Sequence, residues 1–265
     1  AHEYMIKKTE SFTKKEYSPW AYIPGTTAEP FLGCRRSYHI LMSDGGWQTA
    51  PTDNEKPGNT DNNSNLQLPD GTIYNKQKPY SDDHSNMVAD WAFKSWSTNL
   101  QPDLYDPTKP DKQIPLTSAY RNADSIENFG NDTNGNPATL TKYWNPRNNP
   151  ANWPHLVTFT IGFSTAATNW PGEPNIKRPP NDNLVPFSYD SGKNGSLPDF
   201  ITGNIKWPEL TSGTNGTYQT KNPLDLWHSA LNGRGRFYAV ENSEDLEKAF
   251  IEIIGSINTQ AEPDR

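Results

Sequence analysis

Three short apolar runs alternate along this chain with three segments that carry helical patterns, and this order constrains the fold more than any other feature. The runs are rich in β-branched and aromatic residues, as is typical of strands buried on both faces. Strands and helices are expected, in chain order, at Tyr38–Met42, Asn86–Leu100, His155–Phe163, Asn222–Asn232, Arg236–Val240 and Ser243–Ile257. Such alternation predicts an α/β fold with a mostly parallel sheet flanked by helices.

Local signals mark where two of the predicted helices begin and end. Ser85 or Asp83 is expected to cap the helix over 86–100. Asn222 and Pro223 suit the cap and the first position of the next helix, and Gly233 suits its end. We therefore expect these helices to have sharp ends.

Long polar stretches separate the predicted elements. Residues 45–80, 101–153 and 164–221 are rich in Asn, Asp, Gly and Pro and are expected to form irregular loop insertions. The start of the chain is also expected to be irregular, apart from a helix over Glu3–Lys15. With 12% aromatic residues and nine Trp, the composition does not indicate a disordered chain.

Charge and apolar content exclude two classes of partner. The net charge of −7 leaves no overall basic surface for nucleic acid. No apolar run approaches the roughly 20 residues that span a bilayer, so direct membrane insertion is not expected. The single cysteine, Cys34, excludes an internal disulfide and a Cys-based zinc site. We expect a buried, inert thiol, with pairing to a cysteine outside the chain left open.

No pattern of catalytic residues is visible, so the chain is not expected to be an enzyme. The five histidines include no pair at metal-ligand spacing, and the sequence has no Gly-x-Ser-x-Gly motif. His228 follows a Trp within a predicted helix and is expected to be a packed structural residue.

The acidic loops do not form a calcium motif. Asp132, Asn134 and Asn136 have the spacing of an EF-hand loop, but Pro137 and Tyr143 occupy the positions that require Gly and Glu. The remaining acidic loop residues have no defined spacing and are expected to be solvated: Asp53, Asp61 and Asp70.

Four segments match, in order, a pattern of the PilC/PilY proteins found at the tips of type IV pili. They are Cys34–Trp47, Met87–Leu104, Trp153–Phe163 and Asp225–Tyr238. The last, with Leu-Trp-x-x-Ala-Leu-Asn-Gly-Arg-Gly, is the most specific. Together they resemble the von Willebrand factor A-like domain of that family, which implies a Rossmann-type α/β fold.

The resemblance also implies a divalent-cation site that is incomplete here. Von Willebrand factor A domains bind the cation through an Asp-x-Ser-x-Ser loop, a Thr, and an Asp at a Ser/Thr-Asp-Gly turn. Only the turn is present, as Ser43 and Asp44. Residues 1–258 thus resemble the carboxy-terminal portion of the domain without its first strand or strands, and 259–265 a tail or linker. Mg²⁺ or Ca²⁺ is expected only if the missing amino-terminal loop is supplied.

The function implied is a non-enzymatic adhesion or pilus biogenesis module, located extracellularly at the pilus tip. Its expected partners are minor pilins or the rest of the same polypeptide, together with a host or surface ligand. An alternative is a secreted carbohydrate-binding module whose exposed loop tryptophans stack on sugars. The candidates for such contacts are Trp47, Trp144, Trp153 and Trp170, followed by Trp207 and Trp20.

Overall fold

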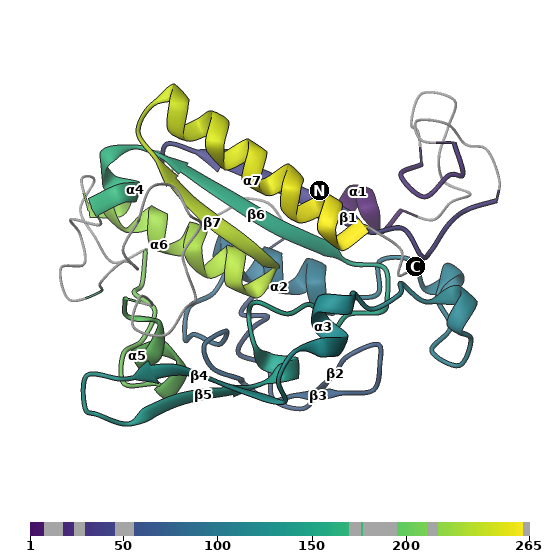
Figure 1. Cartoon of the computed structure of the whole chain (residues 1–265), viewed down its shortest axis with the longest axis horizontal. Helices are drawn as coiled ribbons and strands as arrows, with labels where there is room; N and C mark the ends of the chain where they lie inside the picture. Colours follow the sequence, from purple (N-terminus) through teal and green to yellow (C-terminus); the bar gives the residue numbers. More distant parts are fainter. Residues whose placement is uncertain are drawn as a thin grey trace.

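A three-stranded parallel sheet forms the centre of the molecule, in the order β1–β6–β7 (Figure 1). The structure, a computed structural model, describes residues 1–7, 18–23, 30–45, 56–169, 176, 195–210 and 217–261. The strands are β1 (Ser37–Ser43), β6 (Leu156–Phe163) and β7 (Arg234–Val240). All three predicted strands are confirmed, as is their parallel pairing.

Helices cover both faces of this sheet (Figure 1). Helix α7 (Ser243–Ala261) lies on one face, and α2 (Val88–Ser97) and α6 (Thr217–Asn232) lie on the other. The predicted α/β class with a helix-flanked parallel sheet is therefore confirmed. No helix in the described ranges is long and apolar enough to cross a membrane.

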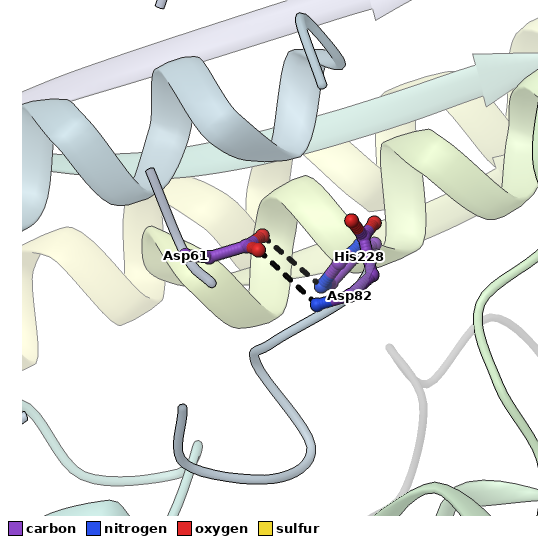
Figure 2. Close-up of side chains that lie close together, drawn as sticks. All are labelled: Asp61, Asp82 and His228. Carbon is purple, nitrogen blue, oxygen red and sulfur yellow. Dashed lines mark hydrogen bonds and ion pairs between the residues drawn. The ribbon is translucent and has the colours of Figure 1, made fainter. Parts of the chain in front are cut away.

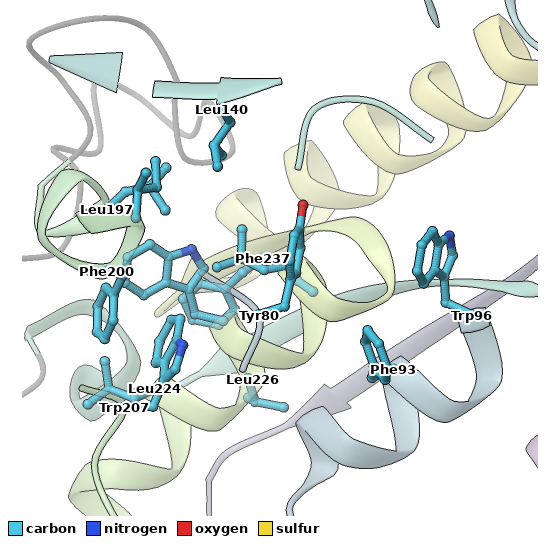
Figure 3. Close-up of a cluster of buried hydrophobic side chains, with 14 of the residues drawn as sticks. Tyr80, Phe93, Trp96, Leu140, Leu197, Phe200, Trp207, Leu224, Leu226 and Phe237 are labelled. Atoms are coloured by element: carbon cyan, nitrogen blue, oxygen red, sulfur yellow. The ribbon is translucent and has the colours of Figure 1, made fainter. Parts of the chain in front are cut away.

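The central strand β6 is buried on both faces because its side chains alternate between two cores. Val157, Phe159 and Ile161 pack in the core beneath α7. Thr160 lies on the other side, where its hydroxyl donates to the Leu226 carbonyl of α6 at 2.7 Å. A larger aromatic core fills the space below α2 and α6 (Figure 3).

The long insertions contain more regular structure than expected. Two antiparallel hairpins, β2–β3 and β4–β5, lie below the sheet (Figure 1). Asp70 and Asp132 accept backbone N–H groups in their turns, at Thr72 and at Asn134. The expectation of irregular loops was wrong here because these elements are too short to show a periodic pattern. They are β2 (Leu66–Gln67), β3 (Ile73–Tyr74), β4 (Ile126–Asn131), β5 (Pro137–Thr141), α3 (Ser118–Asn122), α4 (Thr165–Asn169) and α5 (Leu197–Thr202).

Two helix ends differ from the prediction. Helix α6 begins at Thr217, so Pro223 lies inside it, and the buried Asn222 donates to the carbonyl of Gly45 instead of capping a helix. At the amino end of the chain, α1 covers only His2–Met5, and residues 8–15 of the longer predicted helix lie outside the described residues.

The connection between α6 and β7 lies directly against β6. A Cβ added at Gly235 would lie 2.1 Å from the carbonyl oxygen of Thr158, so only glycine fits there. Gly233 follows the last residue of α6, as predicted. Between the two glycines, Arg234 has φ +58° and a side chain that is 4% exposed. This tight turn therefore places a buried arginine at the start of β7.

Candidate functional site

Two acidic side chains and one histidine meet in the buried interior below the sheet (Figure 2). Asp61 and Asp82 come from the segment that precedes α2, and His228 comes from the middle of α6. Each offers a ligand-type atom, and these atoms lie within 4.8 Å of one another. In the described part of the chain, this is the one group of three or more such residues with metal-ligand geometry.

Both ring nitrogens of His228 have acceptors. Nδ1 lies 3.4 Å from Oδ2 of Asp82, and Nε2 lies 3.7 Å from Oδ2 of Asp61. Nε2 also lies 2.6 Å from the carbonyl oxygen of Tyr80. Because a carbonyl only accepts hydrogen bonds, Nε2 carries a proton. With Nδ1 facing a carboxylate, this arrangement suits a doubly protonated imidazolium.

Trp207 closes the site on one side. Its ring stacks on the imidazole of His228, with centroids 4.1 Å apart and an interplanar angle of 10°. The indole N–H donates to the Pro79 carbonyl at 2.8 Å, which fixes the ring in place. The expectation that Trp207 is exposed was wrong, because it is part of the aromatic core (Figure 3).

Protonation of the cluster follows from its burial and charges. Burial opposes the charge of His228, but the hydrogen bonds to Asp82 and the Tyr80 carbonyl, together with the attraction of negative charge on the neighbouring carboxyl groups, outweigh burial and raise its pKa. Burial raises the pKa of Asp61 to about 8, and the attraction of His228 opposes this shift only in part. At neutral pH, Asp61 is therefore mainly protonated, and His228 retains its proton beside Asp82.

Asp61 also receives two hydrogen bonds from neighbouring segments. The backbone N–H of Asp82 donates to its Oδ1 at 3.2 Å, and the side chain of Asn232 on α6 donates to its Oδ2 at 2.7 Å. Tyr74 of β3 donates its hydroxyl to the Asp61 carbonyl. These contacts attach the segment before α2 to α6 at several points.

Two further buried carboxylates hold the start of α2. Asp225 of α6 accepts the N–H groups of Val88 and Ala89 at 2.9 and 3.0 Å, and Asp90 accepts that of Met87 at 3.0 Å. Burial raises the pKa of both carboxyl groups to about 6, although these backbone donors oppose the shift. The expected cap from Ser85 or Asp83 was wrong, because Asp225 of α6 accepts two of these donors and Asp90, within α2, accepts the third.

One imidazole and two carboxylates could serve as ligands of Zn²⁺ or Mn²⁺. Mg²⁺ and Ca²⁺ prefer oxygen ligands alone, so this site differs from the one expected at Asp44. In the observed arrangement, however, Nε2 of His228 donates a hydrogen bond to the Tyr80 carbonyl and is not free to bind a metal. Protons satisfy the polar atoms of the cluster, and the geometry favours a structural charge network over a metal centre.

The predicted metal residues Ser43 and Asp44 lie apart from this cluster, at the carboxyl end of β1. Asp44 is exposed, and the Ser43 hydroxyl accepts the N–H of Gly45 at 3.1 Å. Neither belongs to a group with metal-ligand geometry within the described ranges. Their role in cation binding stays a prediction.

The tryptophans proposed for sugar contacts are largely buried where the structure describes them. Trp153 is fully buried and donates its indole N–H to the Trp96 carbonyl at 2.8 Å, so the expectation that it is exposed was wrong. Trp20 is buried as well. Trp144 is half-buried against aromatic rings, and Trp47 and Trp170 lie outside the described residues.

Three other residues, His228, Asp61 and Cys34, were assigned a burial state from the sequence. His228 is a packed structural residue, as predicted, but Asp61 is fully buried and not solvated. No short-range spacing connects it to Asp82 or His228, so no sequence signal identified the cluster. Cys34 is a free, exposed thiol, which corrects the expectation that it is buried.

Comparisons with known proteins relate this chain to a pilus protein. It is 35% identical over 244 residues to the type IV pilus biogenesis factor PilY1 of Pseudomonas aeruginosa strain PAK, and equally to that of strain PAO1. The PilY1 of strain UCBPP-PA14 is 33% identical over 225 residues. The first two matches cover 91% of this chain, which spans only 17% of the length of those relatives. No family model and no solved structure matches. The resemblance to the PilC/PilY proteins is confirmed.

Proposed function

We propose, from its relationship to the PilY1 pilus biogenesis factors, that this chain is part of a von Willebrand factor A-like module that acts in pilus assembly and attachment. Identity of 35% along 91% of the chain is the observation that carries this proposal. The module acts outside the cell, at the pilus tip. Its partners are minor pilins or the rest of the same polypeptide, and its loops present the surface that binds them.

The open edge of the sheet supports the hypothesis of a von Willebrand factor A-like domain. Strand β1 pairs with β6 on one side, and no other described strand pairs with its outer side. Ile40 and Met42 of β1 are 37% and 52% exposed. Unpaired strand edges are normally covered in native proteins. We expect a strand from a preceding part of the polypeptide to lie here.

The open edge of the sheet also lies beside Asp44, which we propose as a ligand of a divalent cation. Asp44 follows the carboxyl end of β1, the end at which parallel sheets collect their ligands. A loop that follows an added neighbouring strand would approach Ser43 and Asp44 from the open side. That loop would supply the further oxygen ligands that Mg²⁺ or Ca²⁺ requires.

A non-enzymatic role agrees with the buried cluster. Asp61, Asp82 and His228 are at most 5% exposed, and Trp207 covers the imidazole. A substrate has no access to these groups in this arrangement. Their contacts instead hold the segment before α2 against α6, as a scaffold for the loops requires.

The proposal is tested in a piliated bacterium that carries the full-length protein. Asp44→Ala should reduce surface attachment, measured by adherent cell counts, while the unfolding temperature of the purified chain stays unchanged. Asp103→Ala is the matched control, because Asp103 is an exposed aspartate away from the sheet edge. Deletion of the whole segment should reduce the amount of sheared surface pili. Normal pili and normal attachment after that deletion would refute a role in pilus function.

A further inference from the structure

A cavity, separate from the buried cluster, lies beside the start of β7. Its volume is about 480 Å³, and it is bounded by the second half of α7 and by residues near α3 and Asn148. Three arginines line it, Arg147, Arg234 and Arg236, whereas Glu252 is the one acidic residue in its lining. The whole chain has a net charge of −7, so this lining differs from the rest of the molecule in sign.

Arg234 is a buried cation that pairs with no carboxylate among the described residues. One guanidinium nitrogen, Nη1, donates to the Tyr80 hydroxyl at 2.5 Å and to the Asn145 carbonyl at 3.2 Å. The guanidinium carbon lies 4.4 Å from the ring centroid of Tyr80 and 4.3 Å from that of Trp96. Nε and Nη2 are buried and find no acceptor in the described part of the chain.

Two unused donors on a buried cation are costly, and an anion nearby would lower that cost. The aromatic rings stabilise the charge in part through cation–π contacts. They do not accept the hydrogen bonds that Nε and Nη2 of Arg234 could donate. The structure therefore leaves both a positive charge and donors without a counterpart beside an open cavity.

Arg236 adds a second available cation to the same cavity. It lies two residues after Arg234, and both side chains line the cavity. The guanidinium of Arg236 is in no ion pair with a described residue. Arg147, in contrast, is already paired, with 2.5 Å between its Nη1 and Oε1 of Glu127. Arg234 and Arg236 thus provide the uncompensated charge.

We propose that this cavity binds an oxyanion, namely the carboxylate or phosphate group of a small ligand, between Arg234 and Arg236. Guanidinium groups recognise both kinds of oxyanion through paired, charge-assisted hydrogen bonds. Glu252 repels such a ligand from the side of α7 and limits its affinity. This site is independent of the proposed role in pilus assembly, because it uses none of the residues of the sheet edge.

The test is calorimetric titration of the purified chain with inorganic phosphate and, separately, with succinate, at constant ionic strength in chloride. Saturable binding of at least one probe at a single site is expected. Arg236→Gln should weaken it by about tenfold or more, the usual effect of losing a hydrogen bond to a charged group. Glu252→Gln should strengthen binding, because it removes a repelling charge. Glu247→Gln is the control, since Glu247 is exposed on α7 outside the cavity lining.

The two probes distinguish the source of the oxyanion. Tighter binding of phosphate indicates a phosphorylated ligand, and tighter binding of succinate indicates a carboxylate ligand. The proposal is overturned if neither probe binds saturably at millimolar concentration, or if Arg236→Gln binds as the parent does while its far-ultraviolet circular dichroism is unchanged. Equal effects of Glu252→Gln and Glu247→Gln would also overturn it, because binding would then follow overall charge.

Discussion

Replacing His228 with Gln should destabilise the folded chain strongly. The substitution removes the imidazolium that lies 3.4 Å from Oδ2 of Asp82 and leaves that carboxylate buried without a cation. Breaking a buried ion pair in this way costs about 3–5 kcal/mol. Asp61 adds little at neutral pH, because burial raises its pKa to about 8 and keeps it mainly protonated. Loss of the stacking contact with Trp207 adds about 1 kcal/mol.

The loss is measured by urea unfolding at pH 7, followed by tryptophan fluorescence and circular dichroism. For a total loss of about 5 kcal/mol and an m value of about 3 kcal/mol/M, the midpoint should fall by about 1.7 M. His39→Gln is the control, because His39 is a half-buried histidine on β1, outside the cluster. It should change the free energy of unfolding by no more than about 0.5 kcal/mol.

A double-mutant cycle tests whether the unpaired charge of Asp82 is the reason for the destabilisation by His228→Gln. Adding Asp82→Asn to His228→Gln neutralises the carboxylate left without a partner, so the double variant should recover about 2 kcal/mol relative to the sum of the single losses. If the two losses add, or if His228→Gln alone costs less than about 1 kcal/mol, the imidazolium does not stabilise the fold through Asp82. The same data would then assign His228 a role in packing alone.

Four further outcomes are expected. Because the pKa of Asp61 is raised, its contribution to the free energy of unfolding is complete below pH 3.8 and is lost as the pH rises towards 8. Asp61→Asn should therefore gain stability relative to the parent by up to about 1.4 kcal/mol per pH unit between pH 5 and 8. A difference in urea unfolding that stays constant with pH would contradict this. Trp153→Ala should cost about 3–5 kcal/mol in the same assay, more than Trp144→Ala, because only Trp153 is fully buried. Chelation with EDTA should leave the unfolding temperature unchanged, since protons satisfy the cluster around His228; a fall restored by Zn²⁺ would reveal a metal site. Cys34 should react with a thiol reagent in the native chain as fast as in urea, and strong protection would contradict its exposure.

The sheet was predictable because its strands carry local signals. Buried parallel strands need continuous apolar residues, and Leu156–Phe163 shows this pattern without reference to any other part of the chain. The start of α6 lacked such a signal. Residues 217–221 show no apolar stripe, and Pro223 suggested a first helical position. Helix α6 packs against α2 and β6, and such tertiary contacts override local preference.

The buried cluster is formed by contacts between distant segments, which a local sequence pattern does not record. His228 was recognisable as a core residue from its position beside a Trp on an apolar helix. Asp61 lies in an Asn-rich stretch that resembles a solvated loop, and it is buried only because Tyr74, Asp82 and Asn232 bind it. Contacts between segments so far apart in sequence leave no pattern in a single chain.

The position of α6 near the carboxyl end of the chain also has a consequence for folding order. Asn232 binds Asp61 across 171 residues, and Asp225 caps α2 from 137 residues away. During synthesis, the segment before α2 therefore emerges long before the helix that holds it. Contacts of such long range are typical of slow folding. The first half of this chain is thus exposed to aggregation and proteolysis until α6 is complete, and a nascent chain stopped before Thr217 should not acquire protection of residues 56–97 in hydrogen exchange.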